Sequence, residues 1–144
     1  MGRTDESEKI REGFIKGLKD NGYDVYYIGS RNLEVYQIKK GNRKYIASIK
    51  VSNLRKGFWG INERVFEVSK ECPEKKLGVA CFVFLESPKR GYLLTVDELT
   101  ELKSSLSIDS NRDFKIHKEE LDANFPGSWF LDLDDLFEKL ESIH

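Results

Sequence analysis

The chain has 144 residues, which suits one domain with a proper core, and its 39% hydrophobic and 12% aromatic content can fill that core, so a largely disordered chain is excluded. The formal net charge is −1, no apolar run approaches the length of a membrane span, and the charged N-terminal segment lacks the apolar core of a signal peptide. These features predict a cytoplasmic protein with no membrane partner.

The N-terminal part of the chain predicts one helix followed by three strands. Apolar residues repeat with helical spacing from Asp5 to Asn21, and Asn21-Gly22 is a typical helix end. Strands are expected over Tyr23 to Gly29, Leu33 to Lys39 and Lys44 to Val51. The last two strands should form a hairpin, because Gly41-Asn42 between them is a good tight-turn pair.

The middle of the chain predicts a loop, a short helix and a central strand. The loop spans Asn53 to Ile61, and the helix spans roughly Asn62 to Glu71. Val79 to Leu85 is a continuous apolar run, which is typical of a strand covered on both faces. A turn over Pro88 to Gly91 should then lead into a short strand, Tyr92 to Leu94.

The C-terminal part predicts two helices and a short strand. Thr95 and Glu98 have the spacing of a capping box, which should open a helix that runs to about Ser105. A strand near Phe114 to Ile116 and a turn at Pro126-Gly127 follow. The last helix should begin at an Asp132 cap and bury an apolar stripe of Leu136, Phe137, Leu140 and Ile143. We expect one domain over 1–144, with a core at 5–96 and an acidic extension at 97–144.

Charge is distributed unevenly. From Arg31 to Arg64 there are nine basic residues against two acidic ones, whereas Asp97 to His144 holds thirteen acidic residues against five basic ones. The basic segment could be an electrostatic footprint for a polyanion, or its hairpin lysines could simply protect an exposed edge strand. The acidic tail would repel DNA, so a bound duplex should lie on the opposite side of the molecule.

The order helix, three antiparallel strands, helix, strand resembles the core of the PD-(D/E)XK nuclease superfamily, and archaeal Holliday junction resolvases in particular. In that family a helix glutamate precedes a strand with a metal-binding acid and a strand with a (D/E)-x-K signature. Here the helix offers Glu8 or Glu12, the second strand begins with Glu34, and the third carries Ser48-Ile49-Lys50. The resemblance implies a restriction-endonuclease-like α/β fold: a mixed β-sheet flanked by helices, with a C-terminal helical extension.

The chain departs from the family at Ser48, where a carboxylate is expected two residues before the lysine. A neutral hydroxyl is a poor ligand for Mg²⁺, which prefers charged oxygens. Some restriction endonucleases of the superfamily have S-x-K here and recruit an acid from the following helix. Glu63, thirteen positions after Lys50, could supply it, with Glu67 as a fallback.

The resemblance then implies a metal-dependent chemistry. Glu34, Glu63 and the Ile49 carbonyl would hold Mg²⁺ or Mn²⁺, which polarises the scissile phosphate and activates a water molecule. Lys50 would position that water and offset charge in the transition state. The ordinary alternative is that Glu34 and Lys50 form a cross-strand ion pair at the sheet surface.

The expected DNA contacts are Arg31, Arg55, Lys56 and Trp59. The basic residues would engage phosphates without base specificity. Trp59 belongs to a Phe58-Trp59 pair between two glycines, which could present an aromatic platform for an unstacked base. The pair could also seal the end of the sheet, and this second interpretation is the favoured one.

The two cysteines are not expected to form a site. Cys72 and Cys81 have no CxxC spacing and no nearby His, which favours free thiols over a disulfide or metal site.

The functional expectation combines the resemblance with the departure at Ser48. Together they favour a metal-dependent DNA endonuclease or a catalytically weakened relative that still binds nucleic acid. The alternative is a non-enzymatic protein-interaction domain on the same scaffold; a homodimer has no specific signal.

Overall fold

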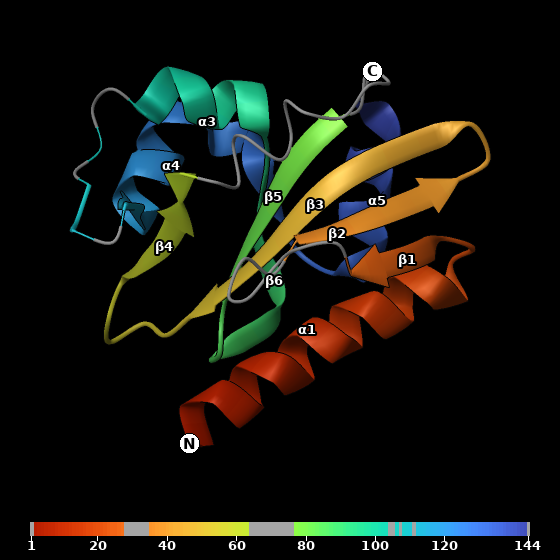
Figure 1. Ribbon diagram of the computed structural model, residues 1–144, viewed down its shortest axis with the longest axis horizontal. Coiled ribbons are helices and arrows are strands. Elements are labelled where there is room, and N and C mark those ends of the chain that lie inside the picture. Colours follow the sequence, from red (N-terminus) through yellow and green to blue (C-terminus); the bar gives the residue numbers. More distant parts are fainter. Residues whose placement is uncertain are drawn as a thin grey trace.

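The computed structural model describes residues 2–27, 35–63, 77–103, 106, 108–110 and 112–143. Helices flank a mixed sheet, as the sequence predicts (Figure 1). The elements, in chain order, are α1 (Gly2–Asp20), β1 (Asp24–Tyr27), β2 (Val35–Lys40), β3 (Arg43–Ser52), β4 (Phe58–Asn62), β5 (Leu77–Phe84), β6 (Ser87–Thr95), α3 (Val96–Lys103), β7 (Asp113–His117), α4 (Lys118–Asn124), the 3-10 helix η1 (Pro126–Ser128), β8 (Trp129–Phe130) and α5 (Leu133–Ser142).

The main sheet has six strands in the order β1-β2-β3-β5-β6-β8. Strands β3 and β5 are parallel, and the other neighbours are antiparallel. Strand β5 therefore lies in the interior of the sheet, which confirms the interpretation of its continuous apolar run. The parallel pair is extensive, since its register runs from Tyr45 opposite Leu77 to Ser52 opposite Phe84.

The N-terminal elements form largely where the sequence predicts them. Helix α1 ends at Asn21-Gly22, where Gly22 has a φ of +90° and the Tyr23 N–H donates to the Leu18 carbonyl at 2.9 Å. The β2–β3 hairpin turns through Gly41-Asn42, with Gly41 at a φ of +61°. The helix expected over 62–71 lies mainly outside the described residues, although Asn62 itself is the last residue of a strand.

Two expectations for the middle of the chain are wrong. The loop expected up to Ile61 contains strand β4, which pairs antiparallel with β7 in a two-stranded sheet, the β4–β7 ribbon. The turn expected at Pro88 to Gly91 is instead part of β6, and the chain turns at Leu85-Glu86. Gly91 is needed inside that strand because a Cβ there would lie 2.1 Å from the Phe82 carbonyl oxygen.

The C-terminal elements confirm the capping predictions. The Thr95 hydroxyl accepts from the Glu98 N–H at 3.1 Å, and the Glu98 carboxylate accepts from the Thr95 N–H at 2.9 Å. Asp132 caps α5 by accepting from the Asp135 N–H at 2.8 Å. Helix α4 and strand β8 were not predicted, because both are short and lack a clear apolar period.

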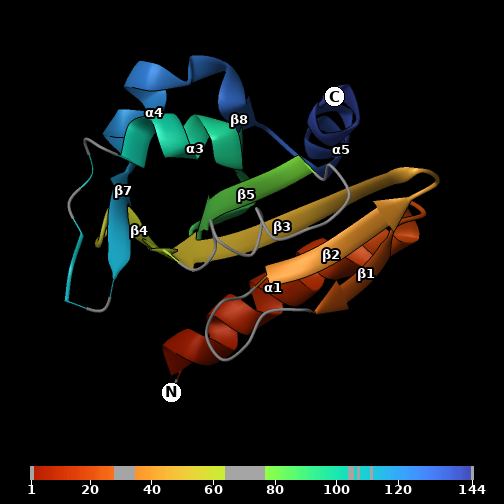
Figure 2. The same cartoon turned by 45° about the horizontal axis from the view of Figure 1, so that its top comes forward.

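The sheet has a buried core on each face. On one face α1 and α5 cover Tyr45, Ala47 and Ile49 of β3. On the other face α3, α4 and the β4–β7 ribbon cover Ile46 of β3 and Phe82 of β5. Figure 2 shows the ribbon at one end of the molecule and α5 at the other. No helix within the described ranges is both long and apolar enough to span a membrane.

Candidate functional site

The predicted site lies on β3, whose side chains alternate between the two cores. Ser48 and Lys50 share a face with Ile46, the face covered by α3 and the ribbon. Across the sheet, Ser48 is in register with Val35 of β2 and with Ala80 of β5. Ser48 is therefore held between two fully buried apolar neighbours, and its own exposed fraction is 1%.

Ser48 is unusual because its hydroxyl is buried and makes no hydrogen bond to any described residue. Burying an unpaired hydroxyl costs free energy, so natural cores generally avoid it. The position is the one where the resemblance places a carboxylate. The chain thus has a polar atom at this point of β3 and no partner for it among the described residues.

Lys50 follows on the same face and is half-buried, next to Phe82 in the register of the parallel pair. A lysine in this setting can bury its aliphatic stem against the sheet and keep its ammonium near the edge of the core. Its partner-strand neighbour Phe82 is fully buried. The arrangement keeps Lys50 close to Ser48 on the same face of the strand.

Glu63 follows β4 directly and is bound to Arg112, which precedes β7. The Arg112 guanidinium donates to both Glu63 carboxylate oxygens, at 2.8 and 3.0 Å, and the Glu63 N–H donates to the Arg112 carbonyl at 2.9 Å. Arg112 has a φ of +66°, in the left-handed region, and the ion pair joins this residue to the end of β4. The hydrogen bond from Arg112 lowers the pKa of Glu63 below its ordinary value.

The described residues do not form the donor set expected for a divalent metal. Ser48 offers a neutral hydroxyl, and both carboxylate oxygens of Glu63 are already bonded to Arg112. No group of three His, Cys, Asp or Glu suitable for a metal occurs among the positions that the structure describes. Glu34 and Glu67 lie outside those positions, and Glu8 and Glu12 are exposed on α1.

Trp59 is placed where it cannot stack on a base, which corrects its assignment as a DNA contact. Its side chain is 1% exposed, its indole N–H donates to the Val83 carbonyl at 2.8 Å, and its ring stacks on Phe84 at 4.4 Å. The ring packs there because Trp59 and Ile61, two positions apart on β4, both point into the core. The favoured interpretation, that this aromatic seals the sheet, agrees with its position.

The two other described DNA contacts, Arg55 and Lys56, are exposed. They lie in a tight loop in which the Asn53 side chain accepts from the Lys56 N–H at 2.7 Å and Gly57 adopts a φ of +73°. The Lys56 ammonium lies 5.0 Å from the centroid of the Phe58 ring. Arg31, the remaining expected contact, lies outside the described residues.

The tip of the basic hairpin is bound to the acidic C-terminal helix. Lys40 pairs with Glu141 at 3.1 Å, and Arg43 donates to the carbonyls of Glu141 and Ile143 at the end of α5. A cation at these unpaired carbonyls stabilises the helix end. This part of the positive segment therefore has a structural role, because the C-terminal end of the acidic helix α5 lies against it.

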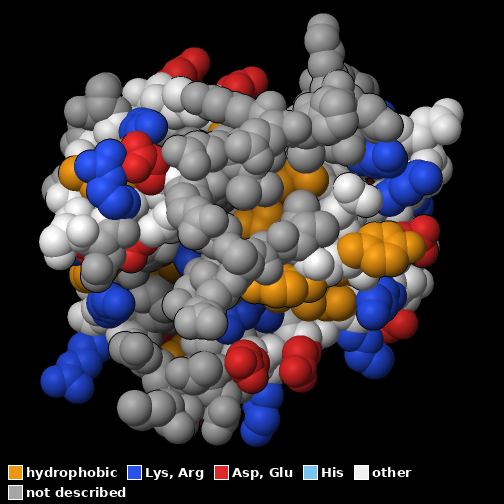
Figure 3. Space-filling model, in the orientation of Figure 1, with side chains coloured by type: hydrophobic (Ala, Val, Ile, Leu, Met, Phe, Trp, Pro, Cys, Tyr) orange, Lys and Arg blue, Asp and Glu red, His pale blue; other side chains and the backbone are white. Residues whose placement is uncertain are grey.

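The described basic side chains are dispersed on the face that Figure 3 shows. On the face in Figure 3, Lys and Arg side chains lie around the margins with Asp and Glu side chains among them. A compact basic and aromatic group occurs on the β4–β7 ribbon, where Lys115 and His117 of β7 both contact Phe58. Sequence reasoning missed these two residues because their proximity to Phe58 depends on pairing between distant strands.

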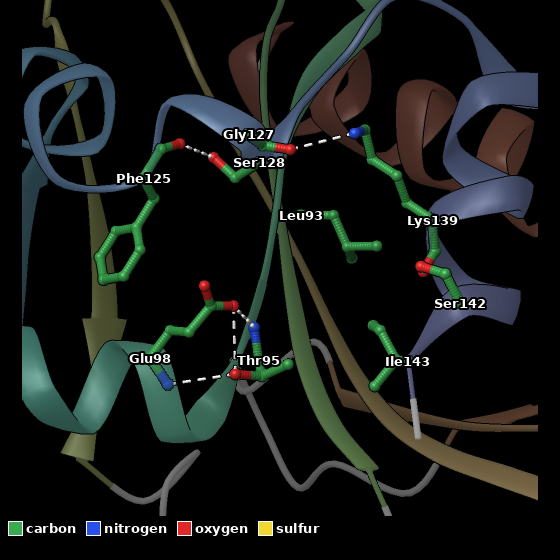
Figure 4. Close-up of a pocket in the computed structure, with 9 residues that line it drawn as sticks. All are labelled: Leu93, Thr95, Glu98, Phe125, Gly127, Ser128, Lys139, Ser142 and Ile143. Carbon is green, nitrogen blue, oxygen red and sulfur yellow. Dashed lines mark hydrogen bonds between the residues drawn. The ribbon is translucent and has the colours of Figure 1, made fainter.

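A cavity of about 230 Å³ lies between α3, η1 and α5 (Figure 4). Its polar groups are mostly engaged: Glu98 belongs to the capping box, and Lys139 donates to the Gly127 carbonyl at 3.0 Å. No residue of β3 lines it, so this cavity is separate from Ser48 and Lys50.

Comparisons with known proteins support the fold. No protein-family model matches the chain, and no curated protein does. The solved structure of Hjc, a Holliday junction resolvase from the archaeal hyperthermophile Archaeoglobus fulgidus, is similar to it with a TM-score of 0.52 and 11% sequence identity. The match covers 78% of this chain and 89% of that chain. The likeness confirms the predicted fold class, a mixed α/β sheet of the kind found in that nuclease.

Proposed function

We propose that this chain is a nucleic-acid-binding protein on a nuclease-like fold whose capacity for metal-dependent DNA cleavage is weakened. The observation that carries the proposal is Ser48, a buried hydroxyl with no hydrogen-bond partner among the described residues, two positions before Lys50 on the same face of β3. The nuclease resemblance expects a carboxylate there. The scaffold and the lysine are kept, whereas a charged metal ligand is absent at this position.

Lys50 supports the binding part of the proposal. A lysine ammonium is a compact cation that suits a phosphate oxygen, and a half-buried position reduces competition from water. The exposed Arg55 and Lys56 beyond the end of the same strand offer further positive charge. These cations would supply affinity for a polynucleotide backbone without reading its sequence.

Cleavage would need more than the described residues offer. We propose Glu34 as the carboxylate that a Mg²⁺ or Mn²⁺ ion would still require, since Glu63 is held by Arg112 and Ser48 is neutral. One charged ligand beside a hydroxyl and a carbonyl makes a weak site for either ion. Activity in Mg²⁺ should accordingly be slow or absent, while binding persists.

The test compares binding and cleavage on the same preparations. Linear, plasmid and branched DNA are assayed for binding in EDTA and for cleavage in Mg²⁺ or Mn²⁺, with wild type, Lys50→Ala and the control Lys39→Ala. Lys39 is an exposed lysine of the neighbouring strand β2. We expect binding that Lys50→Ala weakens several-fold and Lys39→Ala leaves nearly unchanged, with little cleavage.

Two results would contradict the proposal. Vigorous metal-dependent cleavage that Lys50→Ala abolishes would establish an active nuclease, and the proposal that its capacity for cleavage is weakened would be wrong. Failure of the wild-type protein to bind any DNA or RNA would refute nucleic-acid binding and favour a protein-interaction domain on this scaffold.

A further inference from the structure

The outer face of the β4–β7 ribbon combines an aromatic ring with positive charge. Along β4, Trp59 and Ile61 point into the core, so Phe58 and Gly60 occupy the opposite face. In β7, Phe114 and Ile116 point inward, so Asp113, Lys115 and His117 share that outer face, where the Asp113 carboxylate accepts from the Asn62 side-chain amide at 2.8 Å. The cross-strand register places Phe58 opposite His117 and Gly60 opposite Lys115.

Three side chains converge on the Phe58 ring, one from the preceding loop and two from β7. The Lys56 and Lys115 ammonium groups lie 5.0 and 5.2 Å from its centroid, and the His117 ring centroid lies 5.4 Å away. Phe58 is half-buried, so one part of the ring packs against the ribbon and another part faces solvent. Lysines around an exposed aromatic face are typical of surfaces that bind a base and its phosphates together.

Gly60 leaves an open space beside this group. A Cβ at Gly60 would meet nothing closer than the Asp113 Cβ at 3.9 Å, and the residue does not have a positive φ. The glycine is thus required neither by the backbone nor by close packing. It leaves the middle of the outer face flat beside Lys115 and Asp113, and a polynucleotide backbone could approach the strands on the Lys115 side.

The charges at this end of the molecule are mixed, and the cations Lys56 and Lys115 lie nearest the Phe58 ring. The acidic helix α5 lies at the opposite end (Figure 2). Among the nearby acids, Asp122 of α4 pairs with the Lys118 ammonium at 3.0 Å, Glu120 shares a hydrogen bond with the His117 ring at 3.2 Å, and Asp113 of β7 accepts from Asn62. Glu119 of α4 is exposed. Arg55 extends the positive charge beyond Lys56. The ribbon end is therefore a part of the described surface where positive charge and an aromatic ring coincide.

We infer that the outer face of the β4–β7 ribbon binds single-stranded nucleic acid, with one base stacked on Phe58 and adjacent phosphates on Lys56 and Lys115. This inference rests on the proposed function and assigns to it a specific surface. Both ammonium groups lie over the Phe58 ring, so a base that stacks there would displace an ammonium group from the ring face, and the long lysine side chain could then reach the adjacent phosphate. Phe58 thereby provides the aromatic platform for an unstacked base that the sequence suggested for Trp59.

A single strand fits the site better than a duplex. Base stacking on a side chain needs an unstacked base, which a single strand offers without the cost of opening a helix. An acidic peptide would use the lysines but gain little from the ring. The chemistry favours neither DNA nor RNA, so the test includes single strands of both.

The test measures the affinity of fluorescent single-stranded DNA, single-stranded RNA and duplex DNA by anisotropy. Phe58→Ala should weaken single-strand binding roughly 5- to 150-fold, the range that corresponds to about 1–3 kcal/mol per stacked base. Phe58→Tyr keeps a ring and should bind nearly as wild type. Lys115→Ala should lower the salt slope by about 0.7, whereas Phe58→Ala should leave that slope unchanged.

A second pair of variants avoids any loss of packing. Gly60→Ala fits the open space and should bind normally, whereas Gly60→Glu places a negative charge beside Lys115 and should weaken binding at least about 10-fold, the effect of roughly 1.4 kcal/mol. Lys19→Ala, an exposed lysine on α1, serves as the control. Normal single-strand binding by Phe58→Ala and Gly60→Glu would overturn this inference while leaving the proposed function intact. Absence of wild-type binding to every nucleic acid would instead overturn the proposed function as well.

Discussion

Restoring a carboxylate at Ser48 gives a direct test of whether β3 lies at a former metal site. Ser48 is 1% exposed between Val35 and Ala80, and its hydroxyl has no described partner. Ser48→Asp would bury a negative charge there. The burial of this position predicts that the variant is destabilised in the absence of metal, and the proposed function adds that a divalent metal should restore its stability.

The magnitudes follow from burial. An uncompensated charge at a buried position costs about 3–5 kcal/mol, which we expect for Ser48→Asp in EDTA. Ser48→Ala removes an unpaired hydroxyl instead and should raise the free energy of unfolding by about 1 kcal/mol. A metal held by the introduced carboxylate together with Glu34 would return about 2.7 kcal/mol at a hundredfold excess over its Kd.

Urea unfolding followed by tryptophan fluorescence measures these changes in EDTA and in Mn²⁺. Ser48→Asn is the matched control, because asparagine has nearly the size of aspartate without the charge. If Ser48→Asp and Ser48→Asn are equally destabilised and Mn²⁺ restores the stability of neither, the position is not part of a metal site. A Ser48→Ala variant less stable than wild type would show that the hydroxyl has a partner after all.

The remaining predictions concern single groups. Burial raises the pKa of Tyr23 to about 12, and its hydroxyl has no described partner, so Tyr23→Phe should leave the free energy of unfolding unchanged or raise it. Tyr45→Phe should instead lower that free energy by about 1 kcal/mol, because it removes the 2.8 Å hydrogen bond to the Leu140 carbonyl. Urea unfolding compares the two variants. Arg112 lowers the pKa of Glu63, so the ion pair stabilises the fold fully above pH 4.5, the ordinary pKa of that group, and the stabilisation is lost as the pH falls through the lowered pKa. The free energies of unfolding of wild type and Glu63→Gln should therefore converge in acid. A constant difference between the two at every pH would contradict the pairing. Burial raises the pKa of the Cys81 thiol, so in a Cys72→Ser variant a thiol reagent should react only after unfolding; rapid labelling of the folded protein would refute this burial.

The sequence predicts best those elements whose signal is local. Helix α1 follows from apolar residues at helical spacing, and its end follows from Asn21-Gly22. The β2–β3 hairpin follows from Gly41-Asn42 between two strand patterns. The capping box of α3 and the cap of α5 are also local, since their bonds join residues three positions apart. These features need no knowledge of the rest of the chain.

Elements that depend on distant partners are predicted poorly. Strand β4 contains a glycine and follows a turn, so by itself it looks like a loop. It is a strand because β7, which lies far along the chain, supplies its hydrogen bonds. The orientation of Phe58-Trp59 follows from the same pairing: one ring enters the core and the other stays at the surface.

The sequence by itself determined the hairpin that carries Lys50 and the absence of a carboxylate at Ser48, because local patterns and residue identity are properties of the chain alone. The order of its elements, through the family resemblance, also predicted the fold class. Only the tertiary structure decided that Ser48 is buried, that Arg112 holds Glu63, and that Lys115 reaches Phe58. The physical reason is that burial and side-chain contacts depend on which strands pair across the chain, and local sequence does not encode that pairing.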